Sequence, residues 1–232
     1  MQQTFIIQSW NVWPPIAVDD EKLALLQKTI LTSVPKMLKR RLSPLAKTVF
    51  CAALSCEKEV SALPIVFSST HGELAKSLKM MKTIEAGEEI SPTSFSLSVH
   101  NAIAGLFSIA FDNKIQATVL AAGEEGMATA FIEAAGLFHE GESEVLVVFY
   151  DEPLPDFFPS APYQVTAKTC AVALKLIQEG AGQKVTFEKG SISGDEGEQP
   201  LQLPKLIDFL TCQIQQKLQI ITPRHSWHWE KH

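Results

Sequence analysis

The chain has 232 residues, of which 46% are hydrophobic and 20% charged, and its formal net charge is −6 at pH 7. This composition excludes a disordered or fibrous protein, and the length is sufficient for one good-sized hydrophobic core. The negative balance argues against a nucleic-acid-binding protein, because neutralising phosphates requires a clustered positive surface. We therefore expect a single domain over residues 1–232 and no nucleic-acid partner.

One stretch departs from this negative balance. Five cationic residues lie within residues 36–47: Lys36, Lys39, Arg40, Arg41 and Lys47. Such a cluster could meet an acidic partner, but most charge runs of this kind are solvated helix faces. The sequence leaves both readings open.

The N-terminus reads MQQTFIIQSW and has no cationic region followed by a long apolar stretch. No run approaches the roughly 18 apolar residues that are needed to cross a bilayer. We therefore expect a cytoplasmic protein without a membrane span.

Metal-binding patterns are weak throughout the chain. The four cysteines lie in apolar segments rather than in CxxC pairs, so we expect buried, reduced thiols at Cys51, Cys56, Cys170 and Cys212. His225 and His228 lie three residues apart in HSWHW, but no carboxylate or thiol cluster supports them, and this segment could be a flexible tail. We predict no metal site and no cofactor.

The first third of the chain shows a strand, two helices, a strand and another helix. Residues 5–13 are rich in β-formers, and residues 19–34 have helical spacing after an acidic start. Ser43 followed by a proline predicts the start of the second helix. Residues 63–69 form a short apolar run, typical of a strand that is buried on both faces, and residues 70–84 continue as a helix.

The middle of the chain contains the clearest strands. Residues 91–111 begin polar and end apolar, which predicts a loop leading into a buried helix. Residues 116–122 and 144–152 are predicted strands, and the helix at residues 124–140 between them makes a βαβ unit. Such a unit implies parallel strands with a right-handed crossover.

The C-terminal segments are less regular. Residues 163–177 are ambiguous between strand and helix, but their β-branched start and the QKVTFEKG stretch that follows favour strands. Residues 191–204 are rich in turn formers and acidic residues, which predicts an exposed loop. A last helix is expected over residues 205–221.

The helix at residues 124–140 has almost no polar face. Apart from Glu124, Glu125, Glu133 and its last two residues, its positions are small or apolar. A helix of this composition must be covered nearly all round. The cover could be the C-terminal helix, a second domain that this chain lacks, or another protein.

Residues 35 to about 176 resemble the N-terminal half of β-ketoacyl synthases, the condensing enzymes of the thiolase fold. The most specific stretch is SPTSFSLSVHNAIAGLFSIAF, whose serine–proline start, VHNA asparagine and Ala104–Gly105 pair match the family segment without a gap. KRRLSPLAKTVFCAA, SSTHGE and EVLVVFYDE resemble an early helix, a strand-end turn and the strand after the nucleophile helix. The resemblance implies an α/β, thiolase-like N-terminal half, with a mixed, mostly parallel sheet flanked by helices. Residues 177–232 would be a divergent C-terminal extension.

The resemblance places Glu124 at the position of the family's acyl-carrying cysteine, counting backwards from Gly141. A thiolate at a helix N-terminus is stabilised by the helix dipole and exchanges readily with thioesters. A carboxylate suits the same helix end but is a poor substitute in transthioesterification. The family's two catalytic histidines belong to its C-terminal half, where this chain has only His225, His228 and His232, none in a matching motif. We therefore expect no catalytic residue and no enzymatic activity of its own.

Within the family, this profile resembles that of chain-length factors. These are catalytically silent relatives that pair with an active ketosynthase in type II polyketide and fatty acid systems, and the short members of aryl polyene pigment pathways are the most similar in size. The resemblance implies that this chain forms a heterodimer with a full-length β-ketoacyl-ACP synthase. It would thereby also be a partner of the acyl carrier protein.

The resemblance also implies two working surfaces. Family dimers meet through the strand before the nucleophile, which continues the partner's sheet by edge pairing; here its residues are Ala117, Thr118, Val119, Leu120 and Ala121. Side chains of the SPTSF region contribute to the floor of the partner's acyl tunnel; here these are Thr93, Phe95, Leu97 and His100. Their bulk would set where a growing chain stops. Ordinary core packing, or a hydrogen-bonded core position for the histidine, is the alternative.

Two other functions are compatible with the sequence. One is a stand-alone decarboxylase or thioesterase that acts on malonyl or acyl carrier protein and uses Glu124 as a base or electrostatic element. The other is a homodimeric acyl-binding module that buries the apolar helix at residues 124–140 against its own copy.

Overall fold

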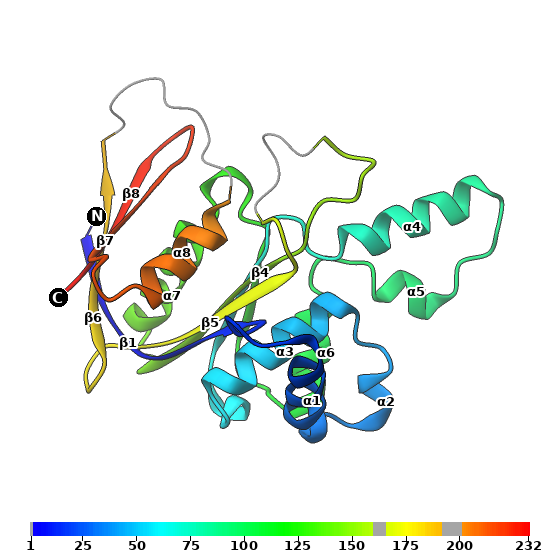
Figure 1. The fold of residues 1–232 in the computed structure, drawn as a ribbon, viewed down its shortest axis with the longest axis horizontal. Helices are drawn as coiled ribbons and strands as arrows, with labels where there is room; N and C mark the ends of the chain where they lie inside the picture. Colours follow the sequence, from blue (N-terminus) through cyan, green and yellow to red (C-terminus); the bar gives the residue numbers. More distant parts are fainter. Residues whose placement is uncertain (1, 160–165, 192–200) are drawn as a thin grey trace.

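The structure is a computed structural model that describes residues 2–159, 166–191 and 201–232, except for the side chain of Glu124. Its described residues form one eight-stranded sheet in the order β3-β2-β4-β5-β1-β6-β8-β7 (Figure 1). The strands are β1 (Gln2–Trp13), β2 (Ile65–Ser68), β3 (Ala117–Leu120), β4 (Glu144–Asp151), β5 (Cys170–Ile177), β6 (Gln183–Gly190), β7 (Lys217–Ile221) and β8 (Ser226–Lys231). The strands predicted over the first two thirds of the chain are confirmed.

The sheet is mixed, as expected, but it is not mostly parallel. β2 runs parallel to both β3 and β4, whereas the five other described pairs are antiparallel. The expectation of a parallel majority is therefore wrong. Parallel neighbours require long crossovers, and helices join β2 to β3 and β3 to β4 within the parallel group, whereas a short turn joins β7 to β8 as an antiparallel hairpin.

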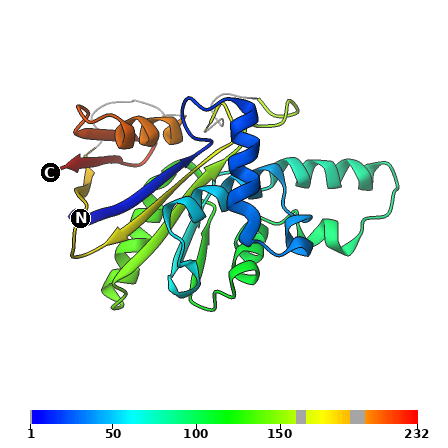
Figure 2. The same cartoon turned by 60° about the horizontal axis from the view of Figure 1, so that its bottom comes forward.

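Helices cover both faces of this sheet (Figures 1 and 2). One face carries α1 (Asp20–Ile30), α3 (Pro44–Cys56) and α6 (Ala102–Phe111), and the other carries α7 (Met127–His139) and α8 (Gln202–Thr211). Successive β4 residues alternate between the two cores, so Val147 packs under α7 and Val148 packs under α3. The continuous apolar run of β4 is explained by this burial on both sides.

The start of α3 follows the sequence closely. Ser43 caps the helix by accepting a hydrogen bond from the Ala46 N–H at 2.8 Å, with Pro44 at the first helical position. Residues 91–111 also form the predicted buried helix, α6, but the short helix α5 (Pro92–Ser96) precedes it where a loop was expected.

The apolar helix α7 is covered by C-terminal residues of this same chain. The ring of Phe131 is buried against the rings of Phe5, Phe149, Phe187 and Trp229, with centroids 5.4–5.9 Å apart. Apolar residues of α8 complete this core. The sequence allowed three covers for this helix: the C-terminal helix, a second domain or another protein. In the structure, the C-terminal segments of this chain, including α8, cover most of it.

The C-terminal segment differs from the prediction. The last helix ends at Thr211, and the residues expected to continue it form β7, which pairs with β8 as an antiparallel hairpin. Buried Leu218 and Ile220 alternate with exposed Lys217 and Gln219, a period of two that suits a strand. The HSWHW stretch enters β8, so it is not a flexible tail.

A helical arm projects from the body of the molecule (Figures 1 and 2). This arm comprises α4 (Leu74–Glu85), α5 and the residues up to Val99. It buries little: α4 contributes only Leu78 and α5 contributes no buried side chain. Four large apolar side chains on the arm are exposed: Met81, Ile84, Phe95 and Val99.

The corner before α3 holds the four-residue helix α2 (Lys36–Lys39). None of the described helices is both long and apolar enough to cross a membrane.

Phe131→Ala should lower the free energy of unfolding by about 3–5 kcal/mol, because it leaves a cavity at the centre of the aromatic cluster. Urea denaturation followed by circular dichroism measures this change. Ile132→Ala is the matched control, since Ile132 is 37% exposed on the same helix and should cost less than about 1 kcal/mol. Equal costs for the two variants would contradict the central role of Phe131.

Candidate functional site

The turn between β3 and α7 lies where the family resemblance expects the reactive group. A short 3₁₀ turn, Gly123–Glu125, connects the two elements. Gly123 and Gly126 have φ angles of +54° and +55°, which side chains rarely adopt, so both glycines are needed for this tight reversal. The backbone of Glu124 lies in the turn as predicted, but its side chain lies outside the described part, so its role stays a prediction.

Gln202 of α8 fills the space in front of α7. The Met127 N–H, the first of the helix, donates to the Gln202 side-chain oxygen at 3.2 Å. Gln202 is only 5% exposed, and a Cβ at Gly126 would collide with it. The remaining hollow measures about 20 Å³, which is room for about one water molecule. The N-terminus of α7 is thus occupied by the chain itself.

The C-terminal hairpin holds the neighbouring Glu125. Its carboxylate accepts hydrogen bonds from Trp227 Nε1 at 2.8 Å and Thr222 Oγ1 at 3.2 Å, and it lies 3.1 Å from His225 Nδ1. The start of α7 is therefore tied to residues about a hundred positions later in the chain. Sequence reasoning missed this role of Glu125, because the HSWHW signal gave no indication of its partner.

The SSTHGE turn after β2 is a packed structural junction. Asp151 at the end of β4 accepts hydrogen bonds from Ser69 Oγ at 2.7 Å and from the backbone N–H groups of Thr70 and His71 at 3.0 and 3.1 Å. Burial raises the pKa of the Asp151 carboxyl, and these donors oppose the rise. His100 donates from Nε2 to the Ser69 carbonyl at 3.0 Å. His100 therefore serves as a hydrogen-bonded anchor of this turn, one of the two roles considered for it.

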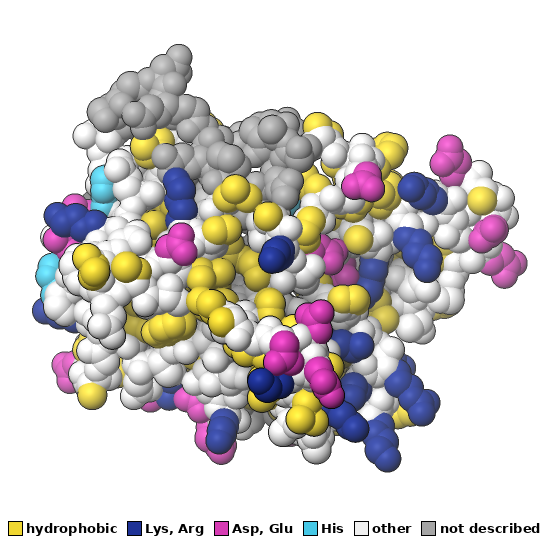
Figure 3. All heavy atoms as spheres, in the orientation of Figure 1, with side chains coloured by type: hydrophobic (Ala, Val, Ile, Leu, Met, Phe, Trp, Pro, Cys, Tyr) yellow, Lys and Arg dark blue, Asp and Glu magenta, His cyan; other side chains and the backbone are white. Residues whose placement is uncertain are grey.

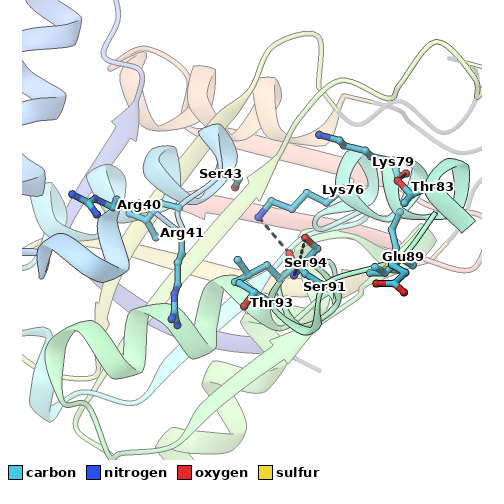
Figure 4. A pocket seen from close by; sticks show the side chains of 14 residues that line it. Arg40, Arg41, Ser43, Lys76, Lys79, Thr83, Glu89, Ser91, Thr93 and Ser94 are labelled. Carbon is cyan, nitrogen blue, oxygen red and sulfur yellow. Dashed lines mark hydrogen bonds between the residues drawn. The ribbon is translucent and has the colours of Figure 1, made fainter.

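A hollow of about 410 Å³ lies between the start of α3 and the arm (Figure 4). Its lining includes two of the predicted tunnel residues, Thr93 and Leu97, but neither Phe95 nor His100. Phe95 is instead 59% exposed on the arm. Lys76 reaches along one side of the hollow and donates to the Leu97 carbonyl at 3.3 Å. The structure therefore divides the predicted tunnel set into hollow-lining, exposed and anchoring residues.

β3 is the terminal strand at one end of the sheet. The carbonyls of Gln116 and Leu120 accept hydrogen bonds from the N–H groups of residues 65 and 69, on the side of β2. In the alternating pattern of a strand, Ala117 and Val119 therefore direct their N–H and C=O groups away from β2. Among the described residues no strand pairs with this outer side. Ala121, the last residue of the predicted interface, follows the strand rather than belonging to it.

Exposed isoleucines lie on two helices that cover opposite faces of the sheet. Ile109 of α6 is 68% exposed on one side, and Ile132 of α7 is exposed on the other. α7 is attached to the strand by a hydrogen bond of 2.8 Å from Thr118 Oγ1 to Glu133. The free edge thus belongs to a strand whose neighbouring helices, α6 and α7, each carry an exposed apolar side chain.

The four cysteines are free thiols, as expected, but they are not all buried. Cys51 and Cys170 are buried, Cys56 is half-buried and Cys212 is exposed at the end of α8, which corrects that part of the prediction. Burial raises the pKa of Cys51 to about 12 and of Cys56 to about 11, and it also raises the pKa of Cys170. These three thiols are therefore poor nucleophiles. No group of three or more His, Cys, Asp or Glu residues in the described ranges is arranged to hold a metal ion.

Residues 10–230 match the family model described as beta-ketoacyl synthase, N-terminal domain. The chain belongs to the β-ketoacyl synthase family. The resemblance inferred from the sequence is thereby confirmed, and with it the thiolase-like fold. No curated protein matches the chain.

Solved structures of synthase complexes share this fold. A chain from the ketosynthase ApeO in complex with its chain length factor ApeC, from Xenorhabdus doucetiae, is 28% identical with a TM-score of 0.78, and the match covers 98% of this chain and 99% of that chain. The ishigamide ketosynthase/chain length factor is 13% identical with a TM-score of 0.60, covering 81% and 67%. The AntDE:AntF ketosynthase and acyl-carrier protein complex is 11% identical with a TM-score of 0.55, covering 81% and 68%. The latter two show the fold alone.

In the native protein at pH 8, a thiol reagent such as Ellman's should react quickly with Cys212 and slowly with the other cysteines. A pKa of about 11 leaves roughly one thiol in 1,000 ionised at that pH. Cys212→Ser should remove the fast phase, and all remaining thiols should react after unfolding in urea. A fast phase that persists in Cys212→Ser would show that one of the other thiols is accessible and activated.

Proposed function

We propose that this chain is a non-catalytic chain-length factor, which pairs with a full-length β-ketoacyl-ACP synthase and shapes its acyl tunnel in polyketide, such as aryl polyene, or fatty acid biosynthesis. The observation that carries the proposal is the match along nearly the whole of this chain to a chain of the ApeO–ApeC complex. Three features of the structure support it: the filled space before α7, the free edge of β3 and the exposed arm.

The filled space before α7 supports a non-catalytic role. Acyl transfer needs a nucleophile and hydrogen-bond donors that are open to the substrate's carbonyl. Here the first N–H of α7 is bound to Gln202, and little more than a water molecule fits beside it. The same closure weighs against a stand-alone decarboxylase or thioesterase acting through Glu124, because such an enzyme needs room for an acyl group at this point.

The free edge of β3 supports pairing with a second β-sheet. A strand edge with unpaired N–H and C=O groups binds another strand through its backbone. Ile109 and Ile132, exposed on the helices that cover the two faces of the sheet, offer apolar area to the same partner. A synthase that presents the equivalent strand edge fits both requirements.

The arm supports the proposed contribution to the acyl tunnel. It extends from the body with apolar side chains exposed and little burial of its own. Exposed apolar patches of this kind mark interaction sites. We assign Phe95 to the tunnel of the partner synthase, with Thr93 and Leu97 behind it at the rim of the 410 Å³ hollow.

Co-expression with its partner synthase should give a stable 1:1 complex, measurable by analytical ultracentrifugation. Val119→Pro should abolish the complex while the isolated chain stays folded, because proline removes an outward N–H without touching the ladder to β2. Val119→Thr keeps the N–H and nearly the same shape, so it should leave the complex intact. If the chain stays monomeric in the presence of the synthase, or if the complex still forms with Val119→Pro, the edge-pairing proposal is contradicted.

Phe95→Ala should lengthen the acyl products of the complex, because a smaller side chain leaves more room at the tunnel's end. Mass spectrometry of the released chains measures this shift. Met81→Ala is the matched control, since Met81 is an exposed apolar residue on the same arm but lies outside the assigned tunnel set. Unchanged product length in Phe95→Ala, with the complex intact, would remove residue 95 from the tunnel.

A further inference from the structure

The arm has little apolar packing to hold it in place. α4 buries only Leu78, α5 buries no side chain, and Leu97 after α5 packs partly against the core under α3. Charged side chains are spread over the outer part of the arm on the face that Figure 3 shows. An element with so few buried apolar contacts has low local stability. The angle between the arm and the body therefore depends on the polar contacts at the base of the arm.

Glu73 joins the start of the arm to the body. It is only 3% exposed, and its carboxylate accepts a hydrogen bond of 2.7 Å from the Ser43 hydroxyl. Ser43 is also the N-cap of α3, and Glu73 directly precedes α4, so this contact connects a helix of the body to a helix of the arm. A carboxylate buried this deeply is costly unless it is paired and hydrogen-bonded.

Lys76 provides the paired charge and also reaches the returning part of the arm. Its ammonium lies 3.1 Å from the Glu73 carboxylate and donates to the Leu97 carbonyl at 3.3 Å (Figure 4). Leu97 follows α5, so this one side chain connects α4 to the segment that leads back to the body. The Glu73–Lys76 pair thus links both parts of the arm to each other and to α3.

Nearby carboxylates make the cation of this pair necessary. Burial raises the pKa of the Glu152 carboxyl, and the negative charges of Glu73 and Asp151 raise it further. The positive charge of Lys76 opposes this rise. The base of the arm therefore gathers negative charge that Lys76 offsets. Without the ammonium group, Glu73 would remain as an uncompensated buried charge.

A small tilt at the base is amplified along the arm. The 12 residues of α4 span about 18 Å, so a tilt of about 10° at the base displaces the far end by about 3 Å. Phe95, which is assigned above to the acyl tunnel, lies on the same arm and would move with it. The angle of the arm therefore affects the room that is left for the end of an acyl chain.

We propose that Glu73 and Lys76 are positioning residues, which sharpen the product length by holding the arm at one angle to the body. This inference rests on the proposed function, in which the arm contributes to the tunnel of the partner synthase. Phe95→Ala should shift the product length. Loosening the Glu73–Lys76 pair should instead broaden the range of lengths, because the arm then takes several positions.

The first measurement reports the position of the arm without the synthase. Spin labels are attached at Lys58→Cys on the body and at Glu88→Cys beyond the end of α4, in a Cys212→Ser background that removes the exposed native thiol. Pulsed electron paramagnetic resonance should give a narrow distance distribution in this parent chain. Glu73→Gln should make the distribution at least about twofold broader. Glutamine keeps an oxygen that can accept from Ser43, so this change removes the charge with the least disturbance.

The second measurement is mass spectrometry of the chains released by the complex with the synthase. Glu73→Gln and Lys76→Gln should each lower the share of the main product length at least about twofold. The double variant should lose no more than the larger single loss, because both changes break the same pair. Lys76→Arg keeps the charge and should keep the main length. The matched controls are Lys82→Gln and Glu85→Gln, exposed residues of the same helix at the same spacing, which should leave the distribution unchanged.

The outcomes separate this inference from the proposed function. If the unaltered chain forms no complex with the synthase, the proposed function fails. If the complex forms but Glu73→Gln and Lys76→Gln give the same product range as the controls, the positioning role is wrong. An equal loss of every product length would indicate a merely structural role and would also overturn it, as would a label distribution that Glu73→Gln leaves narrow. If Lys76→Gln unfolds the chain, Glu73→Gln decides the outcome.

Discussion

The structure depends on covering an apolar helix that has no polar face. α7 packs on the sheet through one side, and apart from exposed Ile132 its other large apolar side chains are shielded by α8 and the C-terminal hairpin. The cluster around Phe131 draws rings from β1, β4, β6 and β8, so it joins the two ends of the chain into one core. Removing these aromatic rings from water, together with the aliphatic side chains around them, stabilises this face of the sheet.

The same cover determines what the start of α7 can do. α8 buries Leu203 and Leu206 in this core, and its first residue, Gln202, lies against Gly126. The side-chain amide then accepts the hydrogen bond of the first helical N–H, which would otherwise be free to bind an anion or an oxyanion. Glu125 adds a second connection to the hairpin through Trp227. The contacts that cover α7 therefore also occupy its N-terminus.

The surfaces that the core leaves uncovered have distinct chemistry. In the described part of the chain, the edge of β3 offers backbone groups that no strand pairs with, the arm offers large apolar side chains, and the corner of α1 and α2 gathers lysine and arginine side chains around an open hollow. Each could satisfy a different kind of contact: a strand edge, an apolar channel and an acidic surface. A subunit that acts through assembly would need such surfaces rather than an open pocket of its own.

The sequence alone determined the local elements that short-range patterns specify. The cap at Ser43, the two-sided burial of β2 and β4 and the βαβ order around α7 all follow from neighbours a few residues apart. Family motifs placed Glu124 in the turn and β3 ahead of it.

Tertiary structure decided the features that join residues far apart in the chain. Three features depend on where the C-terminal segments pack and pair. They are the contact of Glu125 with the HSWHW segment, the position of Gln202 before α7 and the antiparallel majority of the sheet. The KLQII stretch is an example. Its alternating pattern was present in the sequence, but it forms a strand rather than a helix because its backbone pairs with β8.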